Sequence, residues 1–520
     1  MRLASSGVTV QRAHSASAAP PPSPSPTPTP TPTPSPSSDP PAPPAPPSGR
    51  RLTLGGGTAL YVGAVLGPGV LALPALAAAA AGPASILAWA ALLATCVPVA
   101  ACFAALGARF PDGGGVATYV HRAFGPRAAA TVGWWFYGSV PVGVVAGAWI
   151  GGQYTAAAVG WDRTGAAAVA ALLLAAAIAA NSQGLHLSSR IQLLLAGLLA
   201  VLLLAAVIAA APHLRTAHFT PFLPDGWHSV GSAAGVLFFG FVGWEAASHL
   251  SAEFADPRRD LPRVTTLTLI VVGVLYLGLA VTTIGALGPG AATTETPLTA
   301  LLTLSVGDAA RPVAAVVALF LSFGAVNTYL AGAARLGAAL ARDGAAPRWL
   351  ARGGAPGEVP RRSLAVLAVG CALVGAVTAT GAAGLDRLMR ATSTCLAAVT
   401  LAGLLAALTL LPRRTPLWWA AIGSAAVTST VLILSGPLLL IPPALAVVAF
   451  CFHTFQARRK PEDSRTPQTP QAPQRPRAPQ TAAEGPEAPD APGFPGQERE
   501  EPRMTLSSPS APPNSPTNGG

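Results

Sequence analysis

Residues 58–80 read TALYVGAVLGPGVLALPALAAAA, an apolar run whose centre carries Gly67-Pro68-Gly69. Crossing about 30 Å of hydrocarbon takes roughly 20 apolar residues in a helix, so the run is long enough to span a membrane. Proline removes a backbone donor and glycine lowers helical stability, so a helix is expected to break here. In hydrocarbon a break is tolerated only where the freed backbone lines a cavity or contacts protein. The run therefore predicts either a helix opened for a ligand or a simple proline kink.

The rest of the chain has the composition of a membrane protein. Of its 520 residues, 51% are hydrophobic and 10% are charged, whereas soluble domains carry about 25% charged residues. Long apolar stretches between short polar loops predict an all-α polytopic membrane protein with about twelve transmembrane helices. The expected spans are residues 58–81, 84–107, 128–158, 164–180, 191–211, 230–250, 265–287, 312–333, 363–381, 386–411, 417–434 and 437–456.

Two proline-rich tails flank these spans. Residues 1–51 include the tract PPPSPSPTPTPTPTPSPSSDPPAPPAPP, and residues 457–520 form a second, more charged tail. Both compositions predict disorder, and the N-terminal tail has no apolar segment of the kind found in secretory signals. The membrane domain is therefore expected to cover residues 52–456.

The basic residues predict how the chain is oriented. With the N-terminus in the cytoplasm, nineteen basic residues fall on the inside and five on the outside. This excess fits an even number of spans in a multi-pass plasma-membrane protein with both termini cytoplasmic. The formal net charge of +11 does not indicate nucleic acid as a partner, because the basic residues flank apolar segments. The inside set is Arg50, Arg51, Arg109, Arg122, Arg127, Arg190, Arg258, Arg259, Arg263, Arg342, Arg348, Arg352, Arg361, Arg362, Arg413, Arg414, Arg458, Arg459 and Lys460; the outside set is Arg163, Arg215, Arg311, Arg387 and Arg390.

The sixth expected helix is interrupted like the first. Residues 235–254 read GVLFFGFVGWEAASHLSAEF, with Gly240 and Gly243 near the middle. Interrupted helices at corresponding places in two halves of a chain indicate a transporter binding site. The two breaks are five helices apart, which is the spacing that a 5+5 inverted repeat requires. This second break favours a binding site over a simple kink.

Glu245 is the one carboxylate that the sequence places at membrane depth beside a break. Ionisable residues inside the membrane are costly and usually functional. Two roles are open: Glu245 carries a coupling proton, or it accepts hydrogen bonds from loose backbone beside the break. His249, four residues on, shares its helix face, but it falls near the cytoplasmic end, where a packed or solvated histidine is expected.

Five passages resemble the amino acid–polyamine–organocation (APC) superfamily, in particular its bacterial exporters of methionine and branched-chain amino acids. They are GPGVLALP (67–74), FPDGGGVATYVHRAFGPR (110–127), GWWFYGSVPVG (133–143), GFVGWEAASHLSAEFADPRRDLPR (240–263) and NTYLAGAARLGAALARDGAAPRWLAR (327–352). The resemblance covers roughly residues 52–456 and leaves out both tails. It implies a broken-helix transporter fold.

The resemblance also implies where a substrate binds. Its carboxylate is expected at the first break and its amino group at carbonyls of both breaks, with Phe239 covering it as an aromatic gate. Pro68 departs from the serine or threonine usual in the family and has no N–H, so the carboxylate contact depends more on Gly69 and Val70. The implied substrate-binding positions are Val65, Gly67, Pro68, Gly69, Val70, Phe239, Gly240, Phe241 and Val242.

These features predict a secondary active transporter that moves neutral amino acids by alternating access and exports methionine and branched-chain amino acids. Uptake or exchange by a related permease is the nearest alternative, and a non-transporting sensor or scaffold acting through the proline-rich tails is another. No catalytic, metal-ligand or phosphate-loop constellation indicates an enzyme, and no cofactor is expected. The coupling ion, H⁺ or Na⁺, stays open, although the span 191–211 lacks the lysine that some proton-coupled relatives carry.

Overall fold

The computed structural model describes residues 53–110, 115–184, 189–241, 243–244, 254, 256–353 and 358–458. These residues form α-helices joined by short 3-10 turns, and they belong to one compact unit. The N-terminal tail and residues 459–520 of the C-terminal tail lie outside the described residues, as do Val242, Glu245 and His249.

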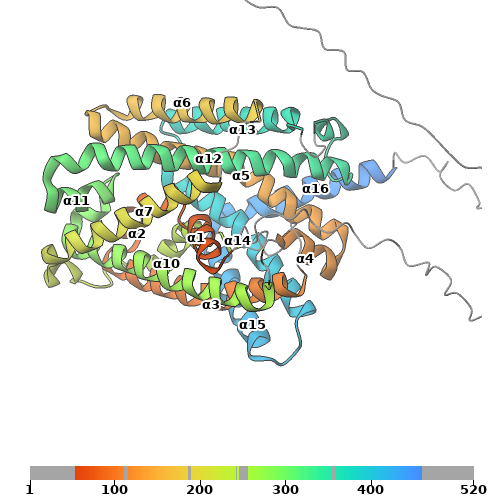
Figure 1. Cartoon of the computed structure of the whole chain (residues 1–520), viewed down its shortest axis with the longest axis horizontal. Helices are drawn as coiled ribbons and strands as arrows, with labels where there is room; N and C mark the ends of the chain where they lie inside the picture. Colours follow the sequence, from red (N-terminus) through yellow and green to blue (C-terminus); the bar gives the residue numbers. More distant parts are fainter. Residues whose placement is uncertain are drawn as a thin grey trace, which may run out of the picture. The chain divides into compact units, whose positions relative to one another are not determined.

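The helices have the following bounds in chain order (Figure 1). They are α1 Leu54–Val65, α2 Leu73–Ala81, α3 Ser85–Arg109, α4 Gly115–Phe124, α5 Pro126–Val159, α6 Arg163–Ser182, α7 Ser189–Ala210, α8 Gly226–Leu237, α10 Pro257–Leu287, α11 Pro297–Val306, α12 Ala310–Arg342, α13 Arg361–Ala379, α14 Leu385–Leu410, α15 Pro416–Leu434 and α16 Ile441–Arg458. Two 3-10 turns matter for the site, η1 (Pro68–Leu71) and η5 (Phe238–Phe241).

Local sequence explains where several helices begin and end. The Asp162 carboxylate accepts hydrogen bonds from the N–H groups of Thr164 and Gly165, both at 3.1 Å, and so caps the start of α6. The Thr415 hydroxyl caps α15 in the same way through Trp418 N–H at 3.2 Å. At the end of α5, Gly160 takes a left-handed conformation with φ of 80°, which glycine adopts without strain.

The described residues contain nine helices that are long and apolar enough to cross a membrane. They correspond to nine of the twelve expected spans. Of the other three, the first is divided into α1, η1 and α2, and the sixth is described only as α8, η5 and two further residues. The twelfth is an apolar helix too short for this count, Gly436–Phe452. The protein is thus an all-helical, multi-pass membrane protein.

Three helices differ from the sequence-based expectation. Residues 115–124, expected as part of a polar loop, form α4, and residues 297–306, left between expected spans, form α11. Helix α12 continues to Arg342 rather than ending near residue 333. All three segments bury apolar side chains against the bundle, such as Tyr119 in α4 and Leu301 in α11, so packing extends helical structure beyond the apolar core of each span.

The helices form two packed groups with α14 between them (Figure 1). In one group α5 packs against α6, α12 and α13; in the other, α10 packs against α1, α3 and α7, while α2 packs against α8. Helix α14 contacts α5 on one side and α3 and α8 on the other. Within the first group, a Cβ at Gly152 of α5 would overlap the Ala166 carbonyl of α6, so glycine permits this close approach.

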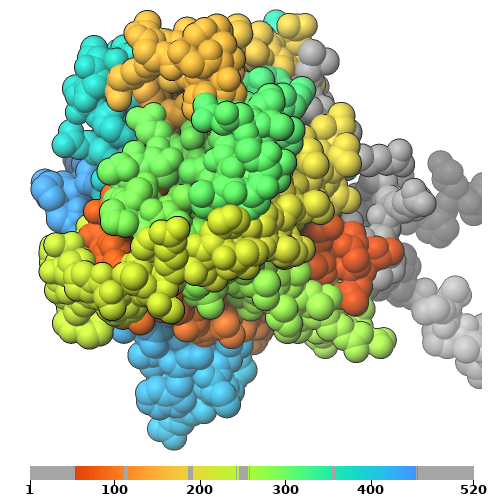
Figure 2. Space-filling view, turned by 90° about the vertical axis from the view of Figure 1, so that its left-hand side faces the viewer, coloured from red at the N-terminus to blue at the C-terminus, as the bar shows by residue number. Residues whose placement is uncertain are grey.

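Helix α15 projects from the bundle (Figures 1 and 2). Its outer face exposes Trp419, Val427 and Ile433, at 59%, 40% and 68% of their surface. A Cβ built at Gly423 of the same helix meets no atom within 4 Å. In a membrane protein such an apolar face contacts lipid. A substitution at Gly423 is therefore a suitable control that is remote from the two interrupted segments.

Candidate functional site

The first break begins where α1 ends at Val65. Gly67 N–H donates to the Val65 carbonyl at 2.9 Å, Val70 N–H donates to the Gly67 carbonyl at 3.3 Å, and η1 follows from Pro68. Within the described part of the chain, Gly69 N–H donates to no other group. Gly67 has φ of −81° and ψ of 175°, which any residue adopts, so the break does not depend on glycine's conformational freedom at this position.

The second break follows α8 and contacts the first. Helix α8 ends at Leu237, η5 follows, and Gly243 has φ of 141°. A Cβ at Gly243 would lie 2.8 Å from the Ala64 carbonyl oxygen and 3.0 Å from the Val65 Cα. Glycine is therefore required at position 243 both by its backbone conformation and by the approach of α1.

Tyr276, at the middle of α10, connects the two breaks. Its hydroxyl lies 3.1 Å from the Val65 carbonyl oxygen and 2.9 Å from the Gly240 carbonyl oxygen. The ring packs edge-on against Trp89 at 5.2 Å and Phe241 at 5.4 Å between centroids, and Tyr276 is fully buried. One hydroxyl thus lies within hydrogen-bond distance of a carbonyl oxygen from each break.

Replacing Tyr276 by phenylalanine is expected to weaken transport without removing the protein from the membrane. The two carbonyl oxygens lose their shared donor, and a buried acceptor left without a donor disfavours contact between the breaks. A hydrogen bond in a membrane interior contributes about 0.6–1.7 kcal/mol, so KM should rise roughly 3- to 20-fold. Flux measured in proteoliposomes tests this.

Tyr137→Phe provides the matched control, because the Tyr137 hydroxyl contacts Ser363 of α13, 3.2 Å away, and Tyr137 does not line the cavity described below. Its KM should stay near that of the unchanged protein. Equal KM values in both variants would show that Tyr276 has no special role in the site.

The breaks open onto a cavity of about 670 Å³, a volume that includes its solvent-open part. Its wall combines both breaks with α5, α12 and α14, so it lies where the two helix groups meet. The lining residues are Ala64, Val65, Gly67, Pro68, Gly69, Val70, Phe136, Ser139, Val140, Gly143, Val144, Gly147, Phe239, Gly240, Ala325, Val326, Tyr329, Thr392 and Leu396.

Most of the positions singled out by sequence line this cavity: Val65, Gly67, Pro68, Gly69, Val70, Phe239 and Gly240. Phe241 does not, because the 3-10 turn directs it toward Trp89, 5.7 Å away between centroids. Phe239 lies over the first break, and its ring would be 2.6 Å from a Cβ at Gly69. Val242 and Glu245 are outside the described residues.

The sequence-based expectation missed the walls contributed by α5, α12 and α14. Phe136, Ser139 and Gly143 occur in the GWWFYGSVPVG passage and line the cavity. The resemblance of this passage to exporters did not identify them as site residues. The sequence could have indicated Tyr276, because its hydroxyl lies in the middle of the apolar stretch 269–281, where a polar group needs a partner. Tyr329 and Thr392 lie within apolar spans in the same way.

The cavity wall carries no charged side chain among its described residues. The Ser139 hydroxyl donates to the Phe136 carbonyl at 2.9 Å, and the Thr392 hydroxyl donates to the Leu388 carbonyl at 2.9 Å. The Val65 carbonyl accepts from Gly67 N–H and shares the single Tyr276 hydroxyl proton with the Gly240 carbonyl. Among its described lining residues the cavity therefore offers a largely apolar interior, a backbone donor at Gly69, the Tyr329 side chain and the carbonyls of η5.

Known proteins resemble this chain over most of its length. A profile of the family described as "Amino acid permease" matches residues 53–466. The uncharacterized amino acid permease YecA of Bacillus subtilis is 34% identical over 78% of this chain and 95% of its own length. The L-methionine/branched-chain amino acid exporter YjeH of Escherichia coli is 34% identical over 55% of this chain and 69% of its own.

A third relative is a permease for branched-chain amino acids that is not named as an exporter. The branched-chain amino acid permease BcaP of Bacillus subtilis is 25% identical over 42% of this chain and 51% of its own length. The family profile, the relatives and the broken helices around an uncharged cavity agree on the class of protein. This chain belongs to the amino acid permease (APC) family, whose members are transporters and not enzymes.

Proposed function

We propose that this permease exports neutral, apolar amino acids, methionine and the branched-chain amino acids, by alternating access around the cavity between the two helix breaks. The observation that carries the proposal is the uncharged wall of this cavity. A charged side chain brought into such a wall would lose its hydration without gaining a partner. The similarity to YjeH, an L-methionine/branched-chain amino acid exporter, supports both the substrate class and the outward direction.

The substrate is proposed to lie across the two breaks. Its carboxylate accepts from the unpartnered Gly69 N–H, and because Val70 N–H already donates to Gly67, Gly69 becomes the principal contact. The amino group binds carbonyls of η5, because the Val65 carbonyl already accepts from Gly67 N–H and lies within hydrogen-bond distance of the Tyr276 hydroxyl. The apolar side chain extends toward Val140, Val326 and Leu396.

The fold proposed for this mechanism is a twelve-helix, 5+5 inverted repeat with cytoplasmic termini. Nine spans long enough to cross the membrane and three further apolar segments support twelve crossings. Both broken segments meet at one cavity, as such a repeat requires. The excess of basic residues on one side supports the orientation.

Efflux from cells loaded with labelled methionine or leucine is the experiment that tests the proposal. Cells producing the protein should release label faster than cells producing a transport-dead variant, and arginine or aspartate should not compete. Repeating the assay in proteoliposomes with and without H⁺ or Na⁺ gradients identifies the coupling ion. Efflux no faster than from control cells would contradict export, and equal competition by arginine would contradict the substrate class.

Uptake is the second candidate, because BcaP is a branched-chain amino acid permease and not named as an exporter. The same proteoliposomes decide between the two directions, because under one imposed gradient an exporter and an importer accumulate label on opposite sides. A non-transporting sensor would show neither flux, and its signalling would survive disruption of the cavity.

A further inference from the structure

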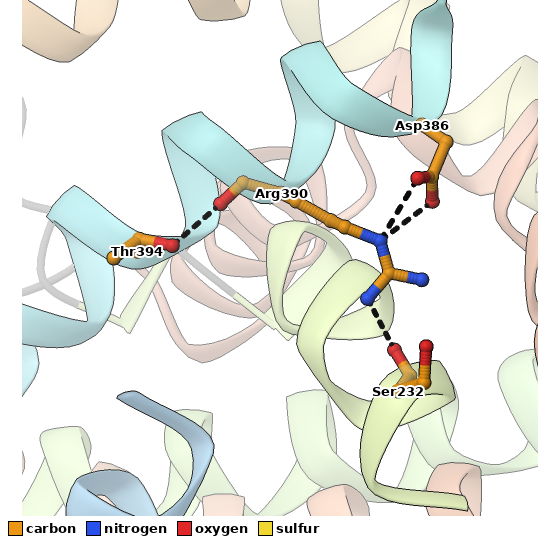
Figure 3. Close-up of polar contacts among 4 residues, drawn as sticks. All are labelled: Ser232, Asp386, Arg390 and Thr394. Carbon is orange, nitrogen blue, oxygen red and sulfur yellow. Dashed lines mark hydrogen bonds and ion pairs between the residues drawn. The ribbon is translucent and has the colours of Figure 1, made fainter. Parts of the chain in front are cut away.

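Arg390 forms an ion pair within α14 and connects this helix to α8 through one backbone contact (Figure 3). Its Nε lies 2.8 and 2.9 Å from the two carboxylate oxygens of Asp386, on the same helix. Its Nη1 donates to the Ser232 carbonyl of α8 at 2.6 Å. The Arg390 side chain is 21% exposed and that of Asp386 is 47% exposed, so the guanidinium is largely withdrawn from solvent.

Arg390 itself does not line the cavity, but residues near it in α14 and near its partner in α8 reach the cavity wall or the first break. Thr392, two residues after Arg390, lines the cavity wall. Met389, the residue before it, has its methyl carbon 3.3 Å from where a Cβ at Gly69 would be. On α8, a Cβ at Gly235 would lie 3.2 Å from Nη1, and Phe239 follows Gly235 by one turn.

The hydrogen bonds of Arg390 leave the Nη1–Nη2 end of its guanidinium without a charged acceptor among the described residues. The group has five N–H donors, and within the described chain only Nε and Nη1 have acceptors. Asp386 binds through Nε alone, so the end formed by Nη1 and Nη2 has only a neutral carbonyl. That end is the planar fork that binds a carboxylate with two parallel hydrogen bonds, which are stronger than bonds to a neutral acceptor.

We propose that Arg390 is an outer binding point for the α-carboxylate of the transported amino acid. In the proposed topology the N-terminal end of α14 and the start of α8 face outside, so Arg390 lies between the cavity and that side. A carboxylate that takes Nη1 and Nη2 displaces the Ser232 carbonyl and releases α8 from α14. Asp386 remains paired with Nε, and its negative charge balances that of Arg390 when no substrate is bound. This inference rests on the proposed function.

Arg390→Gln tests the proposal when KM is measured separately on the two membrane faces. In proteoliposomes of known orientation that exchange labelled leucine, the KM for leucine at the outer face should rise roughly tenfold. The inner KM should stay within about twofold of that of the unchanged protein. Inhibition by leucinamide, which has no carboxylate, should not change at either face.

Arg387→Gln is the matched control, because Arg387 is exposed, lies one turn earlier on α14 and donates only to the Ala382 carbonyl at 3.0 Å. It should alter neither KM. If Arg390→Gln does not reach the membrane, Arg390→Lys keeps the charge beside Asp386 but lacks the fork, and the same rise in outer KM is expected.

Two outcomes would overturn the inference, and they are distinguishable. Equal changes at both faces, or none, would make Arg390 a structural tie between α8 and α14 while leaving the proposed function intact. Absence of leucine and methionine exchange by the unchanged protein would overturn the proposed substrate class, and the carboxylate site with it.

Discussion

Replacing Gly69 by leucine is expected to abolish amino acid transport while the protein remains in the membrane. A Cβ at this position would already lie 2.6 Å from the Phe239 ring and 3.3 Å from the Met389 methyl carbon. The rest of the leucine side chain then displaces Phe239 and occupies the cavity where the substrate carboxylate is proposed to bind. We expect flux to fall roughly a hundredfold or more, because the principal hydrogen-bond donor becomes inaccessible.

Gly423→Leu is the control for this prediction. It introduces the same side chain on the outer face of α15, where a Cβ meets open space, and it should leave flux unchanged. The amount of each variant in the membrane fraction, measured beside flux of labelled leucine, separates lost transport from lost protein. Normal flux in Gly69→Leu would place the substrate elsewhere than at the first break.

Replacing Gly243 by alanine is expected to lower both transport and thermal stability. Its φ of 141° is disfavoured for alanine by about 1–3 kcal/mol. The new methyl group would also meet the Ala64 carbonyl at 2.8 Å, and rigid backbone on both sides cannot move aside as a side chain can. The two breaks should separate, the cavity should lose its shape, and flux should fall more than tenfold with a reduced Tm.

Gly332→Ala makes the same chemical change on α12, where a Cβ meets no atom within 4 Å. Glycine to alanine in a helix favours folding by up to about 1 kcal/mol, so Tm should hold or rise and flux should not change. A Gly243→Ala protein with the flux and Tm of the unchanged chain would show that the contact between the breaks is dispensable.

The residues changed in these variants lie in one region, where the first and second breaks contact each other. Tyr276, Gly243 and Gly69 all lie where the two breaks meet. The Tyr276 hydroxyl lies beside one carbonyl of each break. Position 243 determines how closely the two segments approach, and position 69 determines how much room is left for a ligand. A transporter that alternates between two states must keep these segments together while the helices around them move. The buried contacts of Tyr276 with Trp89 and Phe241 place that junction on rigid packing.

Much of the fold follows from the sequence because its causes are local. Apolar runs long enough to span a membrane, such as residues 385–410, predict helices wherever they occur. Proline and glycine act on their own turn, so the break at Gly67-Pro68-Gly69 was predicted correctly, and so was the interruption near Gly240. Both interrupted segments line one cavity, and that a substrate binds there stays a prediction.

The tertiary structure decided what the local pattern could not. Phe239 and Phe241 stand two residues apart in one turn, yet one lines the cavity and the other packs on Tyr276. The walls from α5, α12 and α14, the two carbonyls beside the Tyr276 hydroxyl and the contact of Arg390 with Ser232 all depend on segments far apart in the chain. A cavity and its hydrogen bonds are properties of contacts between helices, whereas a helix and its break are properties of the chain itself.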